Sequence, residues 1–107
     1  MLTHAEPGTH VIVVALEIRD DALYAAYRAR MTPLLEARAG RFGFDFVVSK
    51  VLKTSGSLAL NRVFSMVFPD RATREAFFAD PTYLKARSEL FEPAVQTVEF
   101  LAEYDQP

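Results

Sequence analysis

Residues 41–68 read RFGFDFVVSKVLKTSGSLALNRVFSMVF, and the alternation in this stretch decides the predicted fold. Residues 41–52 are expected to form a β-strand, because side chains alternate with period two. One side carries Phe42, Phe44, Phe46 and Val48, and the other carries Gly43, Asp45, Val47 and Ser49. Residues 60–68 alternate in the same way. Residues 53–59, centred on Gly56, are expected to form the turn between them. The stretch therefore predicts two neighbouring strands of one antiparallel sheet.

A strand and a helix are expected before these two strands. His10–Ile18 (HVIVVALEI) is β-branched and almost wholly apolar, which favours a central strand buried on both faces. Asp20 and Asp21 then offer an N-cap and first-turn charge to a helix whose apolar residues recur at helical spacing. Pro33 should kink this helix or let the preceding threonine cap a short second segment, and Gly40 is placed to end it.

A second helix and a last strand are expected after residue 68. Asp70 and Asp80 are placed to cap helical segments, and Pro81 suits a first turn. Val95–Tyr104 has the character of the last strand. The order βαββαβ predicts an α+β, ferredoxin-like domain with a four-stranded antiparallel sheet and two helices on one face. No repeat or linker divides residues 1–107, so a single domain is expected.

Strict alternation divides the strand residues between two faces. The more apolar face is assigned to the helices, and its residues are Ile12, Val14, Leu16, Phe42, Phe44, Phe46, Phe64, Met66, Phe68, Val98 and Phe100. The other face mixes apolar and polar residues: Val11, Val13, Ala15, Glu17, Asp45, Val47, Ser49, Val63, Ser65, Val67, Thr97, Glu99 and Leu101. An apolar patch of this size usually marks an interaction surface. We expect a second copy of the chain to cover it, with a cavity between the two sheets.

Composition limits the function classes. The chain has no cysteine, so disulfides, thiolate nucleophiles and zinc–thiolate sites are excluded. The formal net charge of −2 and a pI near 5.6 make nucleic acid an unsuitable partner. The longest apolar run is too short to span a membrane, and the start lacks a signal-peptide pattern. A cytoplasmic protein with no membrane partner is therefore expected.

Short motifs spread along the chain carry a family resemblance. They are Tyr24-x-x-Tyr27, Pro33, Gly40, Asn61-Arg62-Val63, Phe68-Pro69, Ala76-Phe77 and Asp80-Pro81-x-Tyr83. From about Val11 to Tyr104, the chain resembles a small bacterial family of unknown function in the dimeric α+β barrel superfamily. The resemblance implies a homodimer whose two sheets form one barrel. The wider superfamily includes cofactor-free monooxygenases, haem enzymes, lactone isomerases and dehydratases, so the resemblance implies no single reaction.

The candidate pocket-lining residues are Glu17, Asp45, Ser49, Arg62, Ser65, Glu99 and Tyr24. A carboxylate among them could be a general acid or base with a raised pKa in a dry cavity. Alternatively, it could line a solvated barrel mouth or pair with Arg62 or Lys50. Arg62 could hold an anionic substrate or pair with an acidic neighbour. Tyr24, with Tyr27 and Tyr83, could hydrogen-bond a ligand or pack with a wet hydroxyl.

The two histidines, His4 and His10, lie at or before the first strand. Neither haem ligation from the helices nor a His-rich metal site is expected, and no cofactor is predicted. His10 is expected at the surface.

Two functional hypotheses remain open at this point. The first is a small-molecule-binding homodimer, or a cofactor-free enzyme of monooxygenase or isomerase type with a hydrophobic or aromatic substrate. The second is a non-catalytic structural or ligand-sensing dimer whose barrel is filled by its own side chains. The presence of a cavity would favour the first.

Overall fold

The computed structural model describes residues 6–55 and 59–107. Within them, the strands and helices follow the predicted βαββαβ order of an α+β domain, with the second helix divided into several segments. The elements are β1 (His10–Ile18), α1 (Asp21–Ala37), β2 (Arg41–Val47), β3 (Arg62–Phe68), α2 (Arg71–Ala79), α3 (Pro81–Ala86), the π-helical turn η1 (Arg87–Phe91), α4 (Glu92–Ala94) and β4 (Val95–Asp105).

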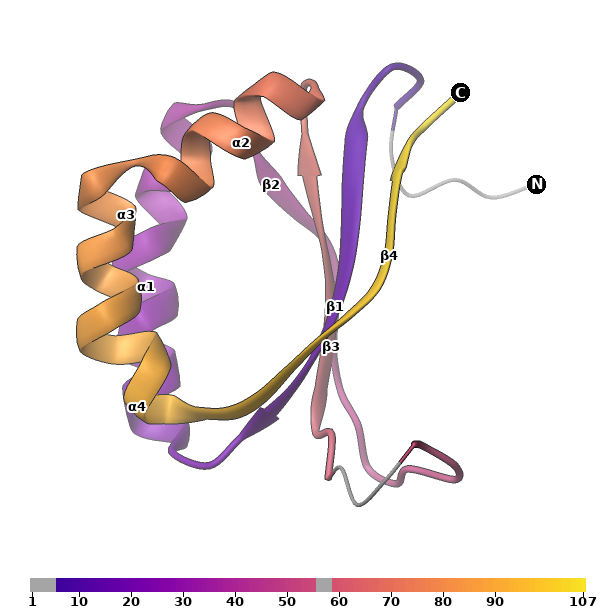
Figure 1. Ribbon diagram of the computed structural model, residues 1–107, viewed down its shortest axis with the longest axis vertical. Helices are drawn as coiled ribbons and strands as arrows, with labels where there is room; N and C mark the ends of the chain where they lie inside the picture. Colours follow the sequence, from indigo (N-terminus) through magenta and orange to yellow (C-terminus); the bar gives the residue numbers. More distant parts are fainter. Residues whose placement is uncertain (1–5, 56–58) are drawn as a thin grey trace.

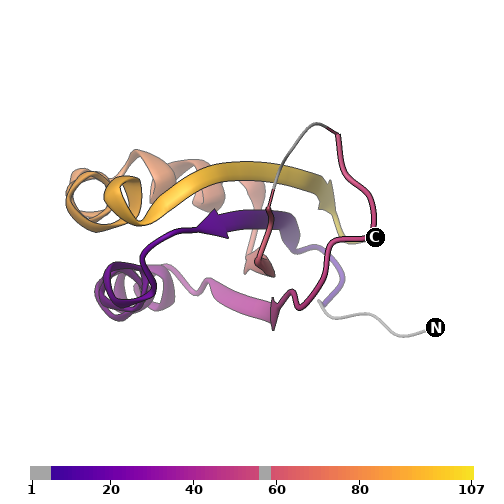
Figure 2. The same cartoon turned by 90° about the horizontal axis from the view of Figure 1, so that it is seen from below.

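The strands form one antiparallel sheet in the order β2-β3-β1-β4. β1 lies inside the sheet between β3 and β4, as its apolar, β-branched sequence predicts. The helices lie together on one side of the sheet (Figure 1). Seen from below, α1 and α4 lie next to each other on that side (Figure 2). We call this the helix face, and the opposite side, which carries no helix of the described residues, the open face.

The main core lies between the helix face and the helices. The predicted helix-face residues of β1 and β3 are all in this core, which confirms the alternation of both strands. Phe77 of α2 and Leu35 of α1 are fully buried against them. Burying a side chain of this size contributes about 1.5–3 kcal/mol. A second, small cluster lies on the open face, where Val11 and Val67 pack with Val13 and Tyr104.

The predicted alternation of β2 is wrong after Phe42. Phe42 pairs with Met66 on the helix face, but the next pair joins Asp45 to Phe64. Residues 43–44 therefore occupy the space of a single residue of β3, which is a β-bulge. Because opposed residues point to the same side of a sheet, the bulge turns Asp45 to the helix face rather than the open face.

The same bulge brings two phenylalanines to the open face, where the alternation had not placed them. Phe46 pairs with Val63, a residue of the open face. The rings of Phe44 and Phe46 are stacked, with centroids 5.2 Å apart and planes 19° apart. The Phe44 N–H donates a hydrogen bond to Ser65 Oγ at 2.9 Å, which satisfies a backbone group that the bulge removes from the ladder. Val47, opposite Arg62, is turned to the helix face.

β4 also departs from strict alternation. Val13 pairs with Ala102 and Val14 pairs with Phe100, so Leu101 is an extra residue in the strand. Phe100 keeps its predicted place on the helix face.

The strands on either side of the turn are shorter than predicted. β2 ends at Val47 instead of Leu52, and β3 begins at Arg62 instead of Leu60. Gly56, the predicted centre of the turn, lies outside the described residues.

The helices differ from the predictions in two ways. α1 continues through Pro33, and the Thr32 hydroxyl donates to the Arg28 carbonyl oxygen at 2.6 Å instead of capping a second segment. The second helix widens into a π-helical turn, in which the Glu92 N–H bonds to the Arg87 carbonyl oxygen five residues earlier. In the described part of the chain, no helix combines the length and apolar character needed to cross a membrane.

The end of α1 depends on two consecutive residues rather than on Gly40 alone. Ala39 has a φ of 59°, in the left-handed region that an alanine adopts only with strain. Gly40 follows in close contact with Leu35, and its N–H donates to the Leu35 carbonyl oxygen at 3.0 Å. A Cβ at position 40 would overlap Leu35 Cδ1 and lie 3.0 Å from Leu35 Cγ. The alanine therefore makes the left-handed turn, and the glycine permits the close packing that follows it.

We predict opposite effects for substitutions at these two positions. Ala39→Gly should raise the free energy of unfolding by about 0.5–1 kcal/mol, because glycine adopts a positive φ without steric cost. Gly40→Ala should lower it by about 1–3 kcal/mol, because the fully buried Leu35 must shift. Urea unfolding of the wild type and both variants measures this. Destabilisation by Ala39→Gly would contradict the description of this turn.

Candidate functional site

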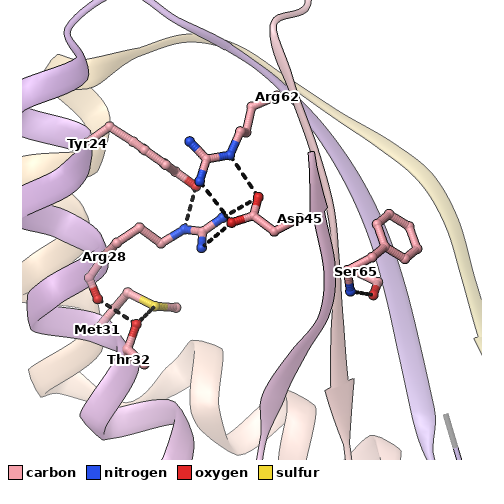
Figure 3. Close-up of polar contacts among 8 residues, drawn as sticks. Tyr24, Arg28, Met31, Thr32, Asp45, Arg62 and Ser65 are labelled. Atoms are coloured by element: carbon pink, nitrogen blue, oxygen red, sulfur yellow. Dashed lines mark hydrogen bonds and ion pairs between the residues drawn. The ribbon is translucent and has the colours of Figure 1, made fainter. Parts of the chain in front are cut away.

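Four side chains from three elements meet at the end of β2 where the bulge has turned Asp45 (Figure 3). Arg62 of β3 binds the carboxylate with two bonds, Nε to Oδ1 at 2.7 Å and Nη2 to Oδ2 at 2.8 Å. Arg28 of α1 reaches the same oxygens at 3.1 and 3.3 Å. Its Nε donates to the Tyr24 hydroxyl at 2.7 Å. We call these four residues the Asp45 cluster.

In the Asp45 cluster one carboxylate lies between two guanidinium groups, so Asp45 is paired and the cluster keeps a net charge of +1. The hydrogen bond from Arg62, together with the charge of Arg28, holds the pKa of the Asp45 carboxyl below its ordinary value of 3.8. Asp45 in turn raises the pKa of Arg62. Burial raises the pKa of the Tyr24 phenol, although the nearby Arg28 acts in the opposite direction. Asp45 is therefore ionised at neutral pH, which is the reverse of what a general acid with a raised pKa requires.

A hollow of about 630 Å³ lies beside the cluster and is lined by Tyr24, Arg28, Arg62 and five neighbouring residues. One of these is Asn61, whose amide bonds both the N–H and the carbonyl oxygen of Ile18, at 2.9 and 2.8 Å. Both arginines of this hollow are already bound to Asp45. Asn61 joins β1 to the start of β3. We therefore interpret the hollow as structural.

The other predicted site residues lie elsewhere. Ser65, Glu17 and Glu99 are on the open face, as the alternation predicts. Ser65 is fully buried, and Glu17 accepts a hydrogen bond from the Thr97 hydroxyl at 3.2 Å. Ser49 is exposed beyond the end of β2. The seven residues thus do not gather at one place, since some lie on the helix face, others on the open face, and Ser49 beyond β2. A ligand role for any of them stays a prediction.

A second, more apolar cavity of about 220 Å³ lies between the helix face and the helices. It contains none of the seven predicted residues, and it lies within one chain rather than between two sheets. Its sheet wall is formed by apolar side chains of three strands, namely Ile12, Val14, Leu16, Phe64, Met66, Val98 and Phe100. Its helical wall adds three pairs of residues, namely Tyr27 and Tyr83, Arg74 and Phe78, and Arg87 and Phe91.

Two buried tyrosines supply the cavity with hydroxyl groups. The Tyr27 and Tyr83 oxygens are 2.9 Å apart and share one hydrogen bond. Burial raises the pKa of both phenols, so both hydroxyls keep their protons at neutral pH. Two hydroxyls carry two protons and their mutual bond uses one. The pair therefore has one proton left to donate.

A chain of polar contacts holds one of the cavity arginines. Arg74 Nε lies 3.2 Å from Glu103 Oε2, and the same carboxylate oxygen is 2.7 Å from His10 Nε2. The other His10 nitrogen, Nδ1, is 2.7 Å from Asp105 Oδ1. His10 is buried, so the expectation of a surface histidine is wrong. These contacts also hold the pKa of Glu103 low, chiefly through the bond from His10.

The cavity arginines were missed at the sequence level, although a local signal exists. Arg74 and Phe78 are four residues apart on one helix, as are Arg87 and Phe91, and each guanidinium lies over its phenylalanine ring. Tyr27 and Tyr83 were considered as ligand donors but could not be paired from sequence, because they are 56 residues apart.

The Asp45 cluster yields a pH-dependent prediction. Asp45→Asn should lower the free energy of unfolding by about 1 kcal/mol at neutral pH, since solvent screens part of this ion-pair network. Because the folded-state pKa of Asp45 is lowered, its stabilisation is complete above 3.8 and decreases as the pH falls below that value. The difference between wild type and variant in urea unfolding should therefore shrink below pH 3.8.

Glu75→Gln is the matched control, because Glu75 makes an exposed ion pair with Arg71 on one helix. It should change the free energy of unfolding by less than about 0.5 kcal/mol. Equal effects of both substitutions, independent of pH, would show that the Asp45 cluster stabilises the fold no more than an exposed ion pair does.

Comparison with solved structures shows the fold but at low sequence identity. A protein of unknown function from Rhodopseudomonas palustris matches with a TM-score of 0.80 and 18% identity over 95% of this chain and 85% of that chain. SnoaB, a cofactor-independent oxygenase from Streptomyces nogalater, matches with a TM-score of 0.65 and 16% identity over 94% of each chain. A dimeric ferredoxin-like protein of unknown function from a Jannaschia species matches with a TM-score of 0.66 and 17% identity over 92% of this chain and 99% of that chain.

These similarities establish the ferredoxin-like fold and leave the reaction open, since one fold supports many functions. A search of curated proteins gave no match. A family model described as a domain of unknown function, DUF1330, matches residues 9–104, which include every strand and helix except the last residue of β4. The chain belongs to the DUF1330 family.

Proposed function

We propose that the protein is a homodimer that binds a small apolar molecule in the cavity between its sheet and helices. The observation that carries this proposal is the cavity itself, with apolar walls, a tyrosine pair and two arginines. Mostly apolar cavities with a few convergent polar groups are the usual binding sites for small molecules. Its volume of about 220 Å³ is below the roughly 300–1,000 Å³ typical of drug-sized ligands, so the ligand is small.

Dimerisation through the open face is supported by the apolar side chains exposed there. Phe46 is 59% exposed and stacks on Phe44, and its strand partner Val63 is also only partly buried. Exposed apolar surface of this kind is usually covered by a partner. The dimeric Jannaschia protein of the same fold adds support.

A cofactor-free enzyme is the second candidate function. The structural similarity to SnoaB and the free tyrosine proton, which could bond a substrate oxygen, favour it. The cavity lining, as far as residues 6–55 and 59–107 form it, includes no Asp, Glu or His. In a reaction in this cavity, the arginines would stabilise an anionic form of the substrate. The described lining offers no carboxylate that could act as the general base.

Phe46→Asp should weaken the dimer without unfolding the chain. Each dimer would place two carboxylates in an apolar interface, and we expect the dissociation constant to rise at least about tenfold. Because Phe46 is mostly exposed in the single chain, its loss should cost little folding free energy. Sedimentation equilibrium measures the association.

Val47→Asp is the control for this experiment. Val47 is the next residue, is 77% exposed and is turned to the helix face, so its substitution should leave the association unchanged. A wild-type chain that sediments as a monomer, or a Phe46→Asp variant that dimerises like wild type, would overturn the proposed interface.

Val98→Phe should weaken binding of a neutral aromatic probe. Val98 lines the cavity and is 38% exposed, so a larger ring there can occupy the cavity without strain. We expect 2-naphthamide to bind the wild type and to bind Val98→Phe at least about tenfold more weakly. Naphthyl fluorescence reports this directly, because the chain contains no tryptophan.

The matched control is Val47→Phe, which enlarges an exposed valine outside the cavity and should bind 2-naphthamide like the wild type. Absence of binding to the wild type, or equal binding to Val98→Phe, would overturn the assignment of this cavity as the ligand site.

A further inference from the structure

The charged side chains that line the apolar cavity are all positive among the described residues. Of the described residues that line it, Arg74 and Arg87 are charged, and none is acidic. Glu103, which pairs with Arg74, is not among them. A cavity with apolar walls and cations at its lining suits a ligand that combines an apolar body with an anionic group.

Arg74 is the better placed of the two arginines. Its side chain is 23% exposed, it lies over Phe78 at 5.0 Å, and its Nε is buried near Glu103. Nε makes no hydrogen bond, since the approach to Glu103 has the distance of an ion pair without hydrogen-bond geometry. Within residues 6–55 and 59–107, no hydrogen bond joins the two Nη groups to an acceptor.

These contacts fix the stem of Arg74 and leave its terminal donors available. His10 Nε2 lies 2.7 Å from Glu103 Oε2 and holds this carboxylate in place. The ion pair with Glu103 therefore fixes the position of Arg74. The two Nη groups of a guanidinium form a planar fork that matches the two oxygens of a carboxylate. A fork that is positioned before binding loses less side-chain entropy when the ligand arrives.

Arg87 has a different role. It is exposed, lies over Phe91 at 5.9 Å, and belongs to the π-helical turn that presents both residues to the cavity. In the described part of the chain it makes no ion pair. It therefore adds positive potential near the cavity, which favours an anion without fixing its position.

We propose that the ligand is a small apolar carboxylate, with its carboxylate bound by the Nη groups of Arg74 and its apolar body between Phe78 and the sheet wall. This inference rests on the proposed function and specifies its ligand class.

The test compares 2-naphthoate with 2-naphthamide, which has nearly the same shape without the charge. We expect the wild type to bind 2-naphthoate about 10–100-fold more tightly than 2-naphthamide, as a charge-assisted bidentate contact should. Arg74→Gln should remove this preference, so that 2-naphthoate binds no more tightly than 2-naphthamide. Arg74→Lys should restore part of it, because lysine keeps the charge but not the fork.

Arg71→Gln is the control, since Arg71 is on the same helix, 68% exposed, and outside the cavity. It should keep the wild-type preference, and thermal unfolding confirms that each variant is folded. Equal binding of both probes to the wild type, or a preference that survives Arg74→Gln, would overturn the carboxylate inference while the cavity remains a ligand site. Binding of neither probe would overturn the proposed function as well.

Discussion

The structure depends on the position of β1 between β3 and β4. Because both of its edges are paired, every backbone group along its length can be satisfied without water, and both of its faces can be covered. Its even-numbered residues, from His10 to Ile18, are all buried on the helix face. Two of its odd-numbered residues, Val11 and Val13, belong to the smaller cluster on the open face. One strand thus contributes to the cavity and to the surface that we propose as the dimer interface.

The sequence was sufficient for the parts of the fold that obey a simple period. β1 was predicted with its observed bounds, and the face assignments of β1 and β3 are confirmed, because these two strands pair without a register shift and strict alternation therefore holds. The predicted face assignment of β2 is wrong from the bulge onward. Gly43 was the available signal, since glycine inside a strand often marks a bulge. The period cannot show which residue is extra, and a shift of one residue moves all later side chains to the other face.

The site was harder to predict than the fold for a related reason. Asp45 was assigned to the open face by the same alternation, whereas the bulge places it between Arg28 and Arg62, where it is ion-paired. The cavity combines residues of three strands and several helical segments, and no short motif contains them. The contact between Tyr27 and Tyr83 depends on how α1 packs against α3. Neither residue's neighbours in the sequence specify that packing.

The two i,i+4 pairs of arginine and phenylalanine connect the fold to the proposed ligand class. In each pair the ring forms part of the cavity wall and the guanidinium lies over that ring, so the apolar and cationic features come from one local helical pattern. α2 provides one pair in regular helical geometry, and the π-helical turn provides the other where the helix widens. Within residues 6–55 and 59–107, only the α2 pair is also tied to the sheet, through Glu103 and His10. That difference in anchoring makes Arg74 suitable for binding one group at a fixed position, whereas Arg87 is suited to attracting it.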